Sequence, residues 1–197
     1  MVTQFFDGGV QCFYGEHCAD GEDDYQEFGP GNLDEVGEQK SCCAANNEKP
    51  KTEFLAEKHP SLWPADAGAR AHARSVCAEM HSGFAALRST LPMNARAGDR
   101  WVELGGDAVG DAERVLEIWE TCRGEHGKAG PWLFGSFTAA DAMYAPVVLR
   151  FHTYGIEAGG LSKGYMETVL SDEHVLEWIS GAEQEEEVIE KFEKGIY

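Results

Sequence analysis

Positive charge is scarce in this chain. Its 197 residues include 16 lysines and arginines against 35 aspartates and glutamates, which gives a formal net charge of −19. Nucleic acids and anionic membranes both bind to cationic protein surfaces, because their phosphate groups are negatively charged. The composition therefore argues against nucleic acid or a membrane surface as the main partner, and it predicts a soluble protein.

Long hydrophobic runs are lacking as well. No apolar stretch approaches the 18 or so residues that indicate a membrane-spanning helix. The first residues, MVTQFFDGG, lack the basic start and long apolar core of a secretory signal peptide. The six cysteines are too few for a disulfide-rich scaffold. We therefore expect a cytoplasmic protein with reduced thiols and no membrane partner.

Residues 1–51 differ from the rest of the chain in composition and in hydrophobic periodicity. The first 50 residues hold eleven acids but only two basic residues, Lys40 and Lys49, a net charge of −9 in a quarter of the length. Glycine-rich turn sequences are frequent there, and neither helical nor strand periodicity is sustained. We expect an irregular, acidic, Cys/Gly-rich segment that is partly disordered.

Four of the six cysteines lie in this segment, at Cys12, Cys18, Cys42 and Cys43. Together with His17 they make a zinc site conceivable, since thiolate and imidazole are the usual zinc ligands. The spacing C-x5-C, however, is not one of the common zinc-site spacings. We favour free thiols, keep a regulatory metal or redox role as the alternative, and predict no metal site.

From residue 52 onward, apolar residues recur at helical spacing. Ala73, Met80 and Leu87 follow one another at intervals of seven, which predicts one long helix over 65–91 that Pro92 ends. Further helices are predicted over the ranges 109–122, 138–154, 162–170 and 172–182. No stretch alternates like a strand, so we expect residues 52–197 to form an all-α domain.

Two helices of this region carry more specific predictions. In the second, six residues are expected to face inward: Val109, Ala112, Val115, Leu116, Trp119 and Cys122. In the third, Thr138 is followed three residues later by Asp141, the spacing of a capping box at a helix N-terminus. Gly155 is well suited to end that helix, because glycine adopts a left-handed conformation at no steric cost. We assign Thr138 and Asp141 a structural role.

Two longer motifs carry a family resemblance. The first is FLAEKHPSLWPADAGARAHARSVCAEMHSGFAALRSTLPMN, and the second is GPWLFGSFTAADAMYAPVVLRFHTYG. Both are similar to segments of the helical C-terminal domain of bacterial-type glutathione S-transferases, and the resemblance covers about residues 52–185. It implies a glutathione S-transferase C-terminal-like helical bundle preceded by the irregular acidic segment.

The same resemblance implies an activity and partners. Members of that family add the thiolate of glutathione, their co-substrate, to an electrophilic small molecule. Their glutathione-binding thioredoxin-like domain is not recognisable in residues 1–51, which contain no Val-Pro and no Glu-Ser pair. No catalytic residue is therefore carried over, and whether the chain is an enzyme stays open. The alternative is a non-catalytic interaction or ligand-binding module derived from such a transferase. In either case the resemblance implies a homodimer formed through the 65–91 helix.

Four residues of that helix are candidates for substrate binding. Arg74 and His81 lie on a basic stripe that could meet an anionic ligand or a partner's carboxylates, and its alternative is a solvated helix face. Met80 and Phe84 could line the electrophile pocket of the family, and their alternative is a place in the hydrophobic core.

Overall fold

The computed structural model describes residues 51–195. The predicted segment 1–51, with Cys12, Cys18, Cys42 and Cys43, lies outside this range apart from its last residue, and the domain boundary after residue 51 stays a prediction. Helix α2 (Lys51–Lys58) is described by itself. All later elements belong to one compact unit that begins at Lys58.

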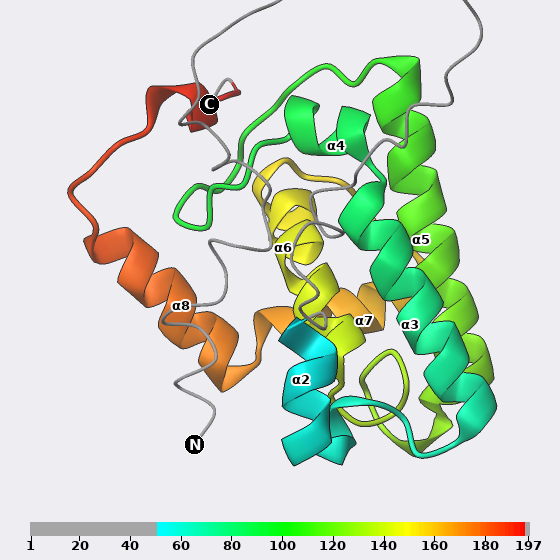
Figure 1. Cartoon of the computed structure of the whole chain (residues 1–197). Coiled ribbons are helices and arrows are strands. Elements are labelled where there is room, and N and C mark those ends of the chain that lie inside the picture. Colours follow the sequence, from blue (N-terminus) through cyan, green and yellow to red (C-terminus); the bar gives the residue numbers. More distant parts are fainter. Residues whose placement is uncertain (1–50, 196–197) are drawn as a thin grey trace, which may run out of the picture. The chain divides into compact units, whose positions relative to one another are not determined.

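The described chain is all-α, as the sequence predicts (Figure 1). No strand occurs in residues 51–195, where the only bridge pairs with both partners described join Trp132 to Gly135 and Phe134 to Ser136. No helix in that range is both long enough and apolar enough to cross a bilayer. The elements after α2 are, in order, η2 (Pro60–Leu62), α3 (Ala67–Ser82), α4 (Ala85–Thr90), α5 (Gly106–His126), η3 (Gly127–Ala129), α6 (Ala139–Thr153), α7 (Gly160–Leu170), α8 (Glu173–Gln184) and η4 (Glu190–Phe192).

Helix α6, yellow in Figure 1, is the central element of the unit. It packs against α3 and α7, while α5 packs against α4 and α7. Nearly all of its residues are buried, including Tyr144 and Phe151. Trp119 of α5 contacts both rings and also Tyr165 of α7, with ring centroids 5.2 to 6.1 Å apart. Burial of these large aromatic side chains is a main source of the fold's stability.

The predicted single helix over 65–91 is wrong, because the structure breaks it into α3 and α4. Gly83 caps α3, and a Cβ atom at Gly83 would lie 2.7 Å from the carbonyl oxygen of Glu79. Phe84 then adopts the left-handed conformation with φ 59°. The change of direction keeps Phe84 and Leu87 in the core, so the heptad pattern is satisfied by two short helices rather than one long one.

The helix predicted over 109–122 also needs correction. Helix α5 begins at Gly106 and ends at His126, and Val109 is 38% exposed rather than inward. Ala108 occupies the inward position instead, in register with the buried Ala112 and Val115. The prediction used the apolar character of Val109, but burial follows the phase of the whole helix.

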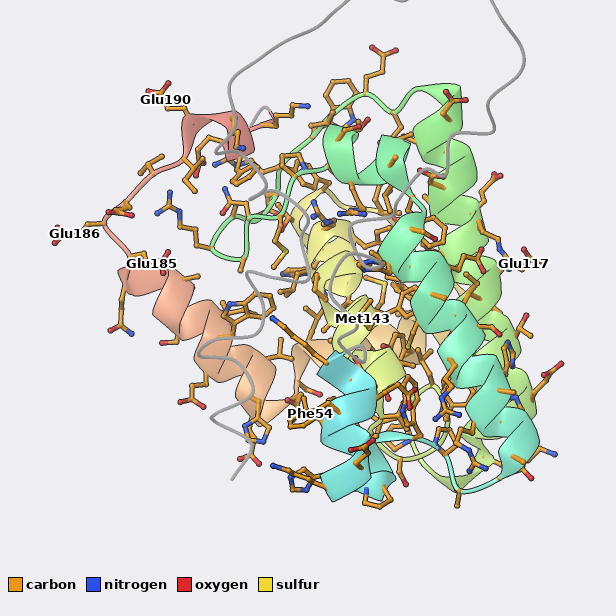
Figure 2. All side chains as sticks on the ribbon, in the orientation of Figure 1. Phe54, Glu117, Met143, Glu185, Glu186 and Glu190 are labelled. Atoms are coloured by element: carbon orange, nitrogen blue, oxygen red, sulfur yellow. The ribbon has the colours of Figure 1, made fainter. Side chains whose placement is uncertain are left out.

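Ion pairs that no sequence pattern predicts bind the segment after α8 to the rest of the domain. Glu193 accepts hydrogen bonds from Arg96 at 2.9 Å and from Arg100 at 2.6 Å, and Asn94 contributes a third at 3.0 Å. These hydrogen bonds lower the pKa of Glu193, with the bond from Arg96 as the largest cause. Other acids of this segment, Glu185, Glu186 and Glu190, project away from the helices (Figure 2).

Candidate functional site

The four predicted substrate-binding residues do not converge on one site. Met80 and Phe84 are 5% and 6% exposed, so both side chains pack in the hydrophobic core. Arg74 and His81 lie on the exposed face of α3, and the guanidinium carbon of Arg74 lies 5.4 Å from the ring centroid of Trp63. The structure thus agrees with the core alternative for the two apolar residues, and a role in substrate binding stays a prediction.

The predicted capping box at the start of α6 is present. One carboxylate oxygen of Asp141 accepts hydrogen bonds from the Thr138 backbone N–H at 2.7 Å and from the Thr138 hydroxyl at 3.0 Å. The other oxygen accepts the backbone N–H of Leu133 at 3.0 Å. Asp141 therefore joins the helix terminus to the loop that precedes it. Burial raises the pKa of Asp141 to about 6, although its hydrogen bonds oppose that shift.

The far end of α6 agrees with its sequence signals too. The helix ends at Thr153, and Gly155 has φ +64°. The N–H of Ile156 donates to the carbonyl of Phe151 at 2.9 Å, which is the wrap-around bond of a Schellman motif. Arg150 of this helix donates to the carbonyl of Leu91.

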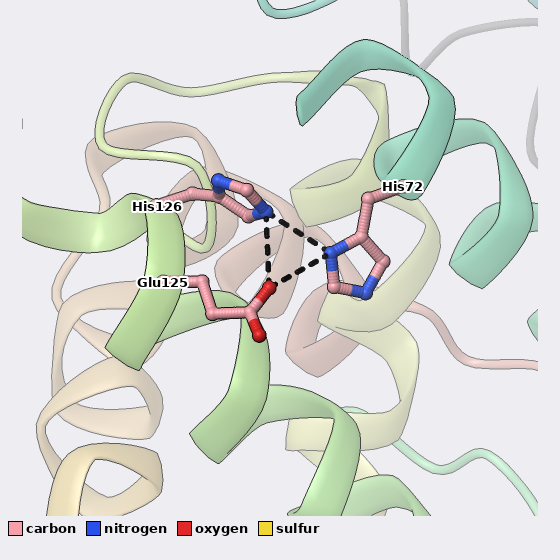
Figure 3. Close-up of side chains that lie close together, drawn as sticks. All are labelled: His72, Glu125 and His126. Atoms are coloured by element: carbon pink, nitrogen blue, oxygen red, sulfur yellow. Dashed lines mark hydrogen bonds and ion pairs between the residues drawn. The ribbon is translucent and has the colours of Figure 1, made fainter. Parts of the chain in front are cut away.

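A cluster of ligand-type side chains lies where α3 meets the end of α5 (Figure 3). The Nδ1 atom of His72 is 3.1 Å from the Nε2 atom of His126. The Oε2 atom of Glu125 lies 3.8 Å from the former and 3.5 Å from the latter. The two imidazoles are half-buried, with about a quarter of each side chain exposed, whereas Glu125 is 61% exposed.

Neighbouring groups hold both imidazole rings. The ring of Phe134 stacks on His126 at 5.2 Å and meets His72 edge-on at 5.8 Å. Phe134 is placed by the loop 127–135, whose carbonyls at Gly127, Gly130 and Trp132 accept hydrogen bonds from Nη1 of Arg123. The loop is also tied to α6, because Asp141 binds the N–H of the residue before Phe134.

The two cysteines among the described residues are free thiols without nucleophilic character at neutral pH. Burial raises the pKa of both Cys77 and Cys122 to about 12. Because the thiolate is the reactive form, both thiols stay inert under ordinary conditions. The Sγ atom of Cys122 lies 3.9 Å from Nε2 of His72, on the side of the ring away from His126.

Sequence reasoning missed the cluster of His72, Glu125 and His126. The predicted end of the second helix at Cys122 left Glu125 and His126 in a loop, and more than fifty positions separate His72 from them. No local spacing links the three residues. The available signal was the pair Glu125–His126 itself, which becomes informative only once α3 is known to pass beside it.

Comparison with known families agrees with the fold. The family model for the C-terminal domain of glutathione S-transferases matches residues 68–181, which is more than half of the chain. The match begins at the first turn of α3 and ends within α8. No curated protein matches the chain. The helical bundle and this match together show that the chain belongs to the family of the glutathione S-transferase C-terminal domain.

Proposed function

We propose that the protein acts as a glutathione S-transferase and that its helical domain binds the electrophilic substrate. Membership of the family carries this proposal. In the reaction, the thiol of glutathione loses its proton, and its sulfur attacks an electrophilic carbon to form a thioether. Cys77 and Cys122 cannot supply that thiolate at neutral pH, since their pKa is about 12. In the family the nucleophile is the thiolate of the co-substrate, and we assign no catalytic residue within residues 51–195.

Calorimetric titration of the intact chain with glutathione tests this proposal. The same preparation is then assayed with 1-chloro-2,4-dinitrobenzene, from which the attacking sulfur displaces chloride. We expect saturable binding and a conjugation rate that rises in proportion to protein concentration. S-methyl glutathione, which has no free thiol, should compete for binding and inhibit the reaction.

The opposite result has a clear meaning. A chain that is helical by circular dichroism but neither binds glutathione nor conjugates the electrophile overturns the proposal. The non-catalytic interaction or ligand-binding module then becomes the better description.

The exposed basic residues of α3 are where we expect an anionic electrophile to bind. Arg74 and His81 are accessible to a ligand, whereas Met80 and Phe84 are buried. Arg74→Ala and His81→Ala should raise the KM for such an electrophile and leave the KM for glutathione unchanged. Lys163→Ala on α7 is the matched control, since it removes a positive charge from a different helix. Equal kinetics in all variants would remove the two α3 residues from the substrate site.

We also propose a homodimer in the cytoplasm, formed through the 65–91 segment. The exposed face of α3 carries the small residues Gly68, Ala71, Ser75, Ala78 and Ser82. The two serine hydroxyls donate to carbonyls one turn earlier, at 3.0 and 2.9 Å, so this face needs no polar partner. A second helix can approach such a face closely.

Sedimentation velocity tests the dimer. We expect the wild-type chain to sediment as a dimer and Ala78→Glu to sediment as a monomer, because two carboxylates would be forced together in the interface. Ser180→Glu places the same charge on α8 and should leave the dimer intact. A monomeric wild type, or a dimer that Ala78→Glu leaves unchanged, contradicts the proposed interface.

A further inference from the structure

His72, His126 and Glu125 have the composition and spacing of a transition-metal site. They come from two helices, and their nearest ligand atoms face a common point (Figure 3). All three ligand atoms lie within 4.8 Å of one another. Two imidazole nitrogens and one carboxylate oxygen are a ligand set that zinc takes from proteins.

The distances suit a tetrahedral ion. With Zn–N bonds of about 2.0 to 2.1 Å, two nitrogens bound to the same tetrahedral zinc lie roughly 3.3 Å apart. The observed separation between His72 and His126 is 3.1 Å. The carboxylate oxygen, at 3.5 and 3.8 Å, lies slightly outside that geometry. Glu125 is largely exposed, so a small rotation of its side chain is enough to bring the oxygen closer.

The two rings are oriented before any ion binds. Phe134 packs against both of them. Nε2 of His72 faces the sulfur of Cys122, a weak hydrogen-bond acceptor, at 3.9 Å. A proton on that nitrogen leaves the lone pair on Nδ1, which faces His126 and Glu125. Groups that fix the tautomer and direction of a histidine in this way commonly support metal ligands in proteins.

The ligand set also selects the class of ion. Ca²⁺ and Mg²⁺ prefer oxygen ligands, whereas imidazole suits Zn²⁺, Co²⁺, Ni²⁺ and Cu²⁺. We propose that His72, His126 and Glu125 bind one Zn²⁺ ion, with a fourth coordination position open to solvent. The ion would link α3 to the C-terminal end of α5. The proposal does not depend on glutathione transfer.

Titration of the metal-free intact chain with ZnCl₂ by calorimetry tests the site. Wild type should bind one Zn²⁺ per chain through these residues. His72→Gln and His126→Gln, which keep the size and polarity of the side chains, should each weaken binding by more than about 100-fold, since loss of an outer-shell partner alone costs 10- to 100-fold. His152→Gln removes an exposed histidine of α6 and should bind as wild type does. Circular dichroism establishes that each variant is folded.

Cys12, Cys18, Cys42 and Cys43 could also bind zinc, so the test must separate the two sources. A variant with these four cysteines changed to serine should keep the ion that the histidine variants lose. Substitution with Co²⁺ gives a second readout, because ligation by nitrogen and oxygen lacks the strong near-ultraviolet charge-transfer band of a cobalt–thiolate bond. Zinc also raises the melting temperature of any chain whose folded state binds it.

The possible results separate the two sources. The proposal holds if zinc stabilises wild type and the serine variant, and if His72→Gln or His126→Gln added to the serine variant abolishes this stabilisation, with no thiolate band in the cobalt spectrum of the serine variant. It is overturned if no zinc binds, if the serine variant still binds zinc after His72→Gln and His126→Gln are added, or if binding depends only on the four cysteines.

Discussion

At the scale of single residues, the buried carboxyl of Asp141 illustrates how one side chain serves several backbone groups. It accepts two backbone N–H groups and one hydroxyl inside the domain. Asp141→Ala leaves these donors without their acceptor and should lower the free energy of unfolding by about 2 to 4 kcal/mol. Urea denaturation measures this loss. Ala142→Gly, which lowers helix propensity at the next, exposed position, should cost only about 1 kcal/mol.

The same carboxyl predicts a pH dependence. Burial raises the pKa of Asp141 from 3.8 to about 6, so between these two pH values the folded state holds a proton that the unfolded state has released. A group whose pKa is raised on folding stabilises the folded state fully when the pH is below its pKa in the unfolded state. This stabilisation is lost as the pH rises through its pKa in the folded state. The difference in unfolding free energy between wild type and Asp141→Ala should therefore be about 1 kcal/mol larger at pH 5 than at pH 8. A difference that is equal at both values, or larger at pH 8, contradicts the raised pKa.

Two buried tyrosines give a matched test of hydrogen bonding. The hydroxyl of Tyr144 donates to the carbonyl of Val76 at 3.1 Å, whereas that of Tyr165 has no hydrogen-bond partner in the described part of the chain. Tyr144→Phe should lower the free energy of unfolding by about 1 kcal/mol, because a buried acceptor loses its donor. Tyr165→Phe should be neutral or stabilising, since it removes a buried polar group without a partner. Thermal denaturation of both variants separates the cases, and equal destabilisation would refute the assignment.

At the scale of elements, the break between α3 and α4 depends on backbone space at Gly83. A Cβ atom there would approach the Glu79 carbonyl oxygen to 2.7 Å, so Gly83→Ala should lower the free energy of unfolding by about 1 kcal/mol or more. Gly110→Ala is the matched control, because Gly110 lies inside α5 and a Cβ atom there would meet no heavy atom within 4 Å. That substitution should stabilise the chain by about 0.5 to 1 kcal/mol. Chemical denaturation should show a lower free energy of unfolding for Gly83→Ala and a higher one for Gly110→Ala. A similar decrease in both variants would contradict the special role of Gly83.

At the scale of the whole described unit, the C-terminal segment is held by Glu193. Its carboxylate binds Arg96 and Arg100, and the latter side chain is 6% exposed. Glu193→Ala should reduce the free energy of unfolding by about 1 to 3 kcal/mol. Folding lowers the pKa of Glu193, so this residue stabilises the folded state when the pH is above the ordinary pKa of glutamate. The stabilisation is lost as the pH falls through the pKa of Glu193 in the folded state.

Hydrogen exchange locates the effect of Glu193. Amides of residues 94–100 should exchange faster in Glu193→Ala, because the loop and the C-terminal segment lose their shared ion pairs. Glu186→Ala removes an acid that projects from the surface and should leave both exchange and stability unchanged (Figure 2). Unchanged exchange in Glu193→Ala would show that the ion pairs do not hold the segment.

Local sequence was enough to establish the all-α class, the family and the two ends of α6. These depend on local physics: helical periodicity, a capping box that spans three positions and a glycine with φ +64° after the helix. The resemblance over residues 52–185 contains the matched range 68–181. Local signals of this kind are legible because the interacting groups are neighbours in the chain.

The remaining features depend on tertiary packing. The break at Gly83–Phe84 follows from which surfaces must be buried against α5 and α6, since the heptad pattern alone fits an unbroken helix equally well. Tertiary packing also decides which face of α5 is buried. It brings Glu193 to Arg96 and Arg100, and it brings His72 to Glu125 and His126, although these residues are distant from one another in sequence. Distances between helices arise from packing, and no spacing within the chain encodes them.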